Sequence, residues 1–126
     1  MTLLVFEYAL VRAVPRVERG EFLNVGAVLY CQARDFLGCG VDLTPDRLRA
    51  LDPGTDLEAV TAALDGICAV CEGRVSAGAA ATGTPRARFG WLTAPRSTVI
   101  QAGPVHSGLT TDPGAELDRL LRRLVG

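Results

Sequence analysis

The sequence contains no lysine, and all 13 of its basic residues are arginines. Without lysine the chain cannot form the phosphate-binding loop of P-loop nucleotidases, which requires a Gly-x-x-x-x-Gly-Lys motif. The formal net charge is only −1, so the molecule as a whole does not attract a phosphate backbone over long range. These absences argue against a nucleic acid as the partner.

Long apolar runs are also missing. No run approaches the roughly 20 residues that a membrane-spanning helix requires, and the N-terminus shows no basic leader followed by a small-residue cleavage site. We therefore expect a cytoplasmic protein with no membrane partner. A length of 126 residues matches one ordinary domain, which we expect to span residues 1–126.

The first half of the chain predicts an antiparallel β-meander. Its strands are Val5 to Val14, Phe22 to Cys31 and Phe36 to Leu43, each rich in strand-forming residues. Pro15 and Gly20 mark the first connection between them. The segment Ser97 to Ala102 predicts a fourth strand, whereas Pro104 to Gly108 is too broken for regular structure.

The strand Phe22 to Cys31 sorts its side chains by parity, because successive residues point to opposite faces. The apolar face comprises Leu23, Val25, Ala27, Leu29 and Cys31. The mixed face comprises Phe22, Asn24, Gly26, Val28 and Tyr30. A buried amide needs hydrogen-bond partners that an apolar core does not supply, so the mixed face is the candidate functional surface.

Pairing of the first two strands places Arg12 opposite Asn24 on that mixed face. Gly38 and Gly40 of the third strand are assigned to the same face, where missing side chains leave room for a backbone or a ligand. A buried guanidinium requires an acceptor, and Glu21 is the nearest one in sequence. We therefore predict a polar cluster of Arg12, Glu21 and Asn24, which a fourth strand could extend with Arg96.

The second half predicts helices. Thr44 followed by Pro45 begins a short helix that ends at Leu51. Apolar residues from Leu57 to Cys71 recur every three or four positions and predict the main helix. Asp112 with Pro113 begins a last helix. The fold class is thus α+β: an antiparallel meander of three to four strands and two to three helices, with the main helix on one sheet face.

Four cysteines, at 31, 39, 68 and 71, permit three interpretations: a zinc site, redox chemistry or core packing. All four fall on apolar faces of predicted elements, where cysteine behaves as a small hydrophobe. Core packing is the favoured interpretation, with no metal and no disulfide. No cofactor is expected.

The single histidine, His106, lies in a Pro-Val-His-Ser-Gly segment. It either caps a backbone group or serves as a binding or acid-base residue. The chain lacks the Gly-x-Ser-x-Gly nucleophile elbow, so no catalytic residue is assigned.

Several of these motifs together resemble a known family. The segments are Tyr8 to Arg12, Val17 to Gly26, Pro95 to Thr98 and Pro104 to Gly108. In this combination they are similar to the bacterial family called domain of unknown function 3037, over nearly the whole chain. The resemblance brings no established activity. Genes of the family can lie beside those of HipA-like serine/threonine kinases, so the resemblance implies such a kinase as a protein partner.

The resemblance also implies a set of polar motif positions as the candidate binding site: Arg12, Glu18, Arg19, Glu21, Asn24, Arg96 and His106. Two functions compete for them. The first is a small non-catalytic module that binds a protein partner or regulates it. The second is an enzyme or binding protein for a phosphorylated or nucleotide-like ligand, with Arg12, Arg19 and Arg96 as anion clamps and Glu21 or His106 as the acid-base group. A deep cleft around these residues would favour the second function, and a flat surface the first.

Overall fold

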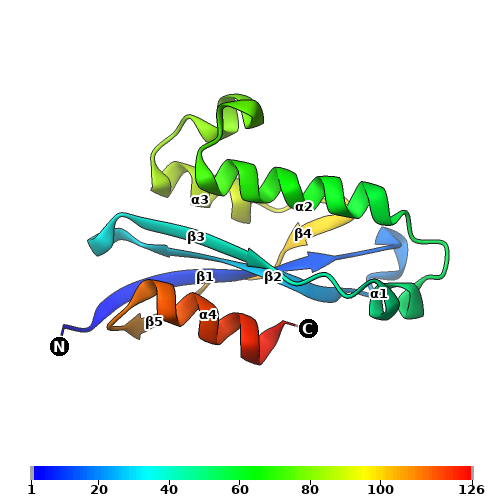
Figure 1. The fold of residues 1–126 in the computed structure, drawn as a ribbon, viewed down its shortest axis with the longest axis horizontal. Helices are drawn as coiled ribbons and strands as arrows, with labels where there is room; N and C mark the ends of the chain where they lie inside the picture. Colours follow the sequence, from blue (N-terminus) through cyan, green and yellow to red (C-terminus); the bar gives the residue numbers. More distant parts are fainter. Residues whose placement is uncertain (1, 126) are drawn as a thin grey trace.

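The computed structural model describes residues 2–125, in which an antiparallel sheet lies between two layers of helices (Figure 1). The strands are β1 (Leu4–Ala13), β2 (Leu23–Cys31), β3 (Phe36–Val41), β4 (Ile100–Ala102) and β5 (His106–Thr110). The α-helices are α1 (Pro45–Leu51), α2 (Leu57–Glu72), α3 (Pro85–Thr93) and α4 (Pro113–Leu124). Short 3-10 helices are η1 (Val17–Arg19), η2 (Gln32–Arg34) and η3 (Val75–Ala81). The α+β class is confirmed, with slightly more strands and helices than expected.

Strand β1 is the centre of the sheet. It pairs with β2 on one side, and β2 pairs with β3, which confirms the antiparallel meander. On its other side β1 pairs with β5 through Leu4 to Tyr8 and with β4 through Val11 to Ala13. The fourth strand therefore lies beside the first.

The expectation of irregular structure from Pro104 to Gly108 is wrong from His106 onward, because β5 begins there. The break is confined to the residues between β4 and β5. Gly103 still donates its backbone N–H to the Leu10 carbonyl at 2.8 Å. Pro104 has no N–H to donate, so the ladder is interrupted. Pairing with β1 resumes at His106, opposite Tyr8.

A β-bulge in β2 changes which side chains share a face. Val11 pairs with Gly26 and Arg12 pairs with Asn24, so Val25 is an extra residue with no partner on β1. An extra residue bends the strand and interrupts the alternation of side chains. As a result, Asn24 shares a face with Ala27, Leu29 and Cys31, whereas Val25 shares the opposite face with Val28 and Tyr30.

Both faces of the sheet are therefore covered, and not as the simple parity assignment predicts. The main helix α2 and helix α3 cover the face of Val25, Val28 and Tyr30. Helix α4 covers the face of Ala27, Leu29 and Cys31 from the opposite side (Figure 1). The main helix does pack on one sheet face, as expected, but that face combines Val28 and Tyr30 of the mixed face with Val25 of the apolar face.

The glycines of β3 face α4. A Cβ at Gly38 would lie 3.1 Å from Leu117, and one at Gly40 would overlap Leu121. The room that these glycines leave is thus filled by the leucines of α4 and is not open to a ligand. Residues Leu37 and Cys39 point the other way, toward α2.

The helix starts follow from local capping. Asp56, Thr84 and Asp112 each accept a hydrogen bond from the backbone N–H three residues later, at the starts of α2, α3 and α4. Such caps satisfy N–H groups that have no partner within the helix. At α2 the cap is Asp56, directly before Leu57. At α3, Thr84 followed by a proline is a start signal that the sequence interpretation missed.

We expect Gly26→Ala to lower the free energy of unfolding by about 1–3 kcal/mol, because overpacking that moves backbone has costs of this size. The added Cβ would lie 2.6 Å from the Gly40 carbonyl oxygen. Urea denaturation followed by circular dichroism measures the change. The control is Gly66→Ala on the exposed surface of α2, where a Cβ meets nothing within 4 Å; it should stabilise the protein by about 0.5–1 kcal/mol. Equal effects at both sites would contradict the close approach at the bulge.

Candidate functional site

Arg12 lies near the end of β1 on the α4 side of the sheet, between Asn24 of β2 and Gln101 of β4. Its guanidinium carbon is 4.1 Å from the centre of the Phe22 ring. The backbone of Gly103 also borders it, since a Cβ there would lie 3.1 Å from the same carbon. Stacking on an aromatic ring attracts the cation and holds its plane in one orientation.

The Arg12 guanidinium has no carboxylate partner among residues 2–125. Its Nε atom is buried without a hydrogen-bond partner, and so is the Oδ1 atom of Asn24. The Asn24 amide nitrogen donates to the Leu124 carbonyl of α4 at 3.4 Å. Each unpaired buried group costs about 1–3 kcal/mol. The site is thus polar, partly desolvated and unsatisfied.

The charged turn around η1 does not complete this cluster. Arg19 binds Glu21 at 2.9 Å, and both side chains are exposed. Glu21 therefore has a different partner from the Arg12 that we expected. Glu18 is also exposed. Gly20 takes a φ of 70°, a left-handed conformation that glycine adopts without strain, and this closes the turn.

Arg96 lies on the opposite side of the sheet, at the end of α3. Its guanidinium is 4.1 Å from the Trp91 ring and donates to the carbonyls of Trp91 and Leu92. A cation at a helix C-terminus satisfies carbonyl groups that lack a partner in the helix. Arg96 thus stabilises α3 and does not join Arg12.

His106 does share the face of Arg12. It is opposite Tyr8 in the pairing of β5 with β1, and the two rings are 5.4 Å apart. Alternation along β1 places Tyr8, Leu10 and Arg12 in one row. We call this surface the Arg12 face; its members are Tyr8, Leu10, Arg12, Phe22, Asn24, Gln101 and His106, all of them half-buried or exposed. Helix α4 packs mainly on β2 and β3. Tyr8 and Leu10 pack against the edge of its core cluster and keep part of their surface exposed.

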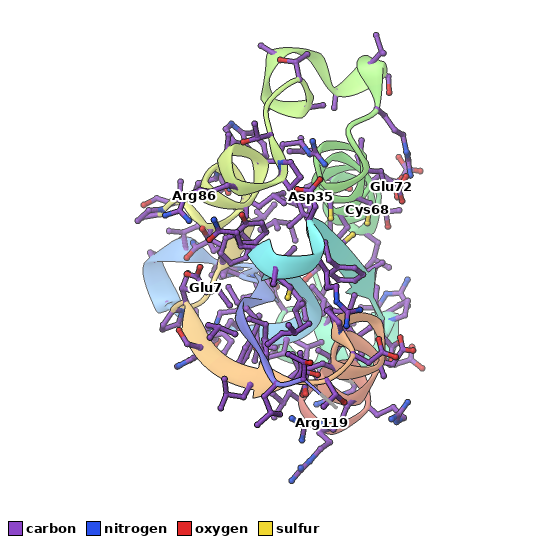
Figure 2. All side chains as sticks on the ribbon, turned by 90° about the vertical axis from the view of Figure 1, so that its left-hand side faces the viewer. Glu7, Asp35, Cys68, Glu72, Arg86 and Arg119 are labelled. Carbon is purple, nitrogen blue, oxygen red and sulfur yellow. The ribbon has the colours of Figure 1, made fainter. Side chains whose placement is uncertain are left out.

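The best-formed hollows lie away from the Arg12 face. Five of them, of about 220 to 510 Å³, are lined by none of the seven predicted site residues. One of them contains charges of both signs, Glu7 and Arg86, between the sheet and α3 (Figure 2). The geometry at Arg12 is that of an open surface.

Three contacts of the Arg12 face were not predicted from the sequence: the stacking of Phe22 on Arg12, Gln101 as the neighbour on β4, and Tyr8 as the partner of His106. Phe22 itself was assigned to the mixed face with Asn24, so only its contact with Arg12 was missed. Gln101 and Tyr8 required the register of β4 and β5.

Among residues 2–125, no group of three or more His, Cys, Asp or Glu side chains is arranged to hold a metal ion. Within the same residues, no helix is long and apolar enough to cross a membrane. Three of the four cysteines nevertheless approach one another, as described below.

Comparison with known proteins identifies the family. Residues 8–125 match the family model described as protein of unknown function (DUF3037), and the chain therefore belongs to this family. The resemblance of its motifs is thereby confirmed. No curated protein and no solved structure matches the chain.

We expect Arg12→Ala to lower the free energy of unfolding by only about 1 kcal/mol, the size of one cation–π contact, because the side chain has no carboxylate partner among residues 2–125. Arg12→Met, which keeps most of the aliphatic stem, should cost still less. Urea denaturation of both variants gives the values. A loss of about 3 kcal/mol or more in Arg12→Ala would mean that the guanidinium is one half of a buried ion pair.

Proposed function

We propose that this member of the DUF3037 family is a non-catalytic module that binds a protein partner through the Arg12 face. The observation that carries the proposal is the unpaired Arg12 guanidinium, stacked on Phe22 at 4.1 Å with its Nε atom buried and unsatisfied. A carboxylate from a partner would supply the missing acceptor.

The chemistry of the surface supports a carboxylate-bearing partner. A guanidinium presents several N–H groups in a fixed plane and binds a carboxylate through two parallel hydrogen bonds. Stacking on Phe22 fixes the orientation of the Arg12 guanidinium in advance, so less side-chain entropy is lost on binding. The last turn of α4, beside Asn24, contributes Arg122 and Arg123 and no carboxylate.

The aromatic residues of the Arg12 face support a protein partner over a small ion. Phe22 is 44% exposed, and the Tyr8 and His106 rings contact each other at a tilt on the same face. Aromatic residues and arginine are enriched where proteins bind each other, because they combine large contact areas with a polar tip. An exposed row of this kind suits a partner that covers apolar and polar atoms together.

A phosphorylated or nucleotide-like ligand is the second candidate, and the geometry favours it less. That function needs Arg12, Arg19 and Arg96 to converge. Instead Arg19 binds Glu21, and Arg96 caps α3 on the other side of the sheet. Small ligands are normally held in a cleft that buries most of their surface, and no hollow described above includes these residues.

The experiment is affinity capture from the native host with three immobilised baits: the unchanged protein, Arg12→Glu and Arg86→Glu. Arg86 is an exposed residue of α3 on the opposite face, so its variant matches the change of charge away from the Arg12 face. We expect the unchanged protein and Arg86→Glu to retain the same partners. Recovery of these partners should fall about tenfold or more on Arg12→Glu, because removing a charge-assisted hydrogen bond costs about 1.5–3 kcal/mol. Quantitative mass spectrometry measures the recovery, and a HipA-like kinase is the first candidate to look for.

Equal recovery of the same proteins on the Arg12→Glu bait would refute the proposal. A thermal-shift measurement with ATP and inorganic phosphate tests the second candidate. Stabilisation of the unchanged protein by either compound, lost in Arg12→Glu, would favour the ligand-binding function instead.

A further inference from the structure

Three cysteines from two elements meet at the boundary between the sheet and the main helix. Cys39 lies in β3 and points toward α2, where Cys68 and Cys71 are one helical turn apart. The sulfur atoms of Cys39 and Cys68 are 3.5 Å apart. Figure 2 shows Cys68 on α2 close to other sulfur atoms. The fourth cysteine, Cys31, lies on the α4 face of the sheet.

The cysteines differ in access to solvent. Cys39 and Cys68 are half-buried, whereas Cys71 is 2% exposed and Cys31 is fully buried. A dissolved oxidant therefore reaches the Cys39 and Cys68 pair before the other two. Cys39 and Cys68 are thus both close to each other and accessible to solvent.

We propose that Cys39 and Cys68 are an oxidative modification site at which a peroxide-class oxidant forms a disulfide that links β3 to α2. One sulfur attacks the O–O bond of hydrogen peroxide, which gives a sulfenic acid and one water. The second sulfur then attacks the sulfenic sulfur, forms the S–S bond and releases a second water. The two thiols lose two electrons and two protons, and the peroxide takes up both.

The geometry requires only a small movement. A disulfide bond is about 2.05 Å long, so the two sulfur atoms must approach by about 1.5 Å from their separation of 3.5 Å. Rotation about the side-chain bonds moves a sulfur atom by distances of this size. Strand and helix are already packed together at this point.

The environment makes the reaction slow at neutral pH. Burial, and then the charge and hydrogen bond of Cys39, raise the pKa of Cys68 to about 12, with Glu72 and Asp65 adding to the shift. The pKa of Cys39 is also raised, mainly by its hydrogen bond with Cys71 and by burial. Because the thiolate is the reactive form, the rate of disulfide formation should rise about tenfold per pH unit between pH 7 and 9.

Cys71 has the opposite shift. The hydrogen bond from Cys39 lowers its pKa, and Arg88 lowers it further. Cys71 is therefore the most acidic thiol of the three, but also the least accessible. This makes Cys71 the decisive comparison. If acidity determined the reaction, Cys39 would be linked to Cys71, and if access to the oxidant determined it, Cys39 would be linked to Cys68.

The experiment treats the full chain with hydrogen peroxide, blocks the remaining thiols with N-ethylmaleimide under denaturing conditions, and maps the linkages by mass spectrometry. We expect one intramolecular Cys39 to Cys68 linkage that dithiothreitol reverses, with Cys31 and Cys71 alkylated. Because the linkage closes a loop across 29 positions, the melting temperature should rise by about 5–10 °C.

Two variants complete the test. Cys68→Ala should abolish both the linkage and the rise in melting temperature, and Cys71→Ala should retain both. A Cys39 to Cys71 linkage, a linkage between two molecules, or oxidation only to sulfinic acid would each overturn the proposal.

Discussion

The close approach of β2 and β3 at Gly26 is the constraint on which the rest of the structure depends. Only a residue without a side chain lets the Gly40 carbonyl come within 2.6 Å of the Cβ position. The adjacent bulge leaves Val25 without a partner on β1 and turns it toward α2. Asn24 is thereby turned toward α4, where it binds the Leu124 carbonyl. One extra residue in β2 thus places Val25 in the core and the adjacent Asn24 in the candidate site on the other face.

Helix α4 is narrower than the sheet face on which it packs, so part of that face, the Arg12 face, remains accessible to solvent. Its leucines fill the space above Gly38 and Gly40 and cover β2 and β3. Tyr8 and Leu10 of β1 pack against the edge of this cluster, yet Tyr8 and Arg12 remain half-exposed although β1 is central in the sheet. Central strands are normally buried on both faces when helices cover both. The partly exposed Arg12 face is therefore a specific feature of this arrangement.

Sequence reasoning predicted the strand order of the meander because the apolar runs and their turns are strong local signals. It also placed Arg12 opposite Asn24 correctly, although it assumed that side chains alternate without a bulge. The bulge at Val25 follows Asn24 in β2, so it does not disturb this pair. It could not predict the faces beyond Val25, since a bulge depends on contacts with β1 and β3. The partner of Glu21 was also missed. In the exposed turn, Arg19 is only two residues away and forms the ion pair with Glu21.

The unsatisfied Nε atom of Arg12 also indicates that this residue is retained for a purpose other than folding. The Nε atom of Arg12 is buried without an acceptor, which costs about 1–3 kcal/mol, and total folding stabilities are only about 5–15 kcal/mol. Here Gly103 approaches the guanidinium so closely that a Cβ would lie 3.1 Å from it, and Phe22 stacks on it. Two neighbours thus accommodate an arginine that contributes little to the fold. A residue that leaves a buried atom without an acceptor and contributes so little to the fold is the kind expected of a binding group. This distinguishes Arg12 from Arg96, which donates hydrogen bonds to the carbonyls of α3.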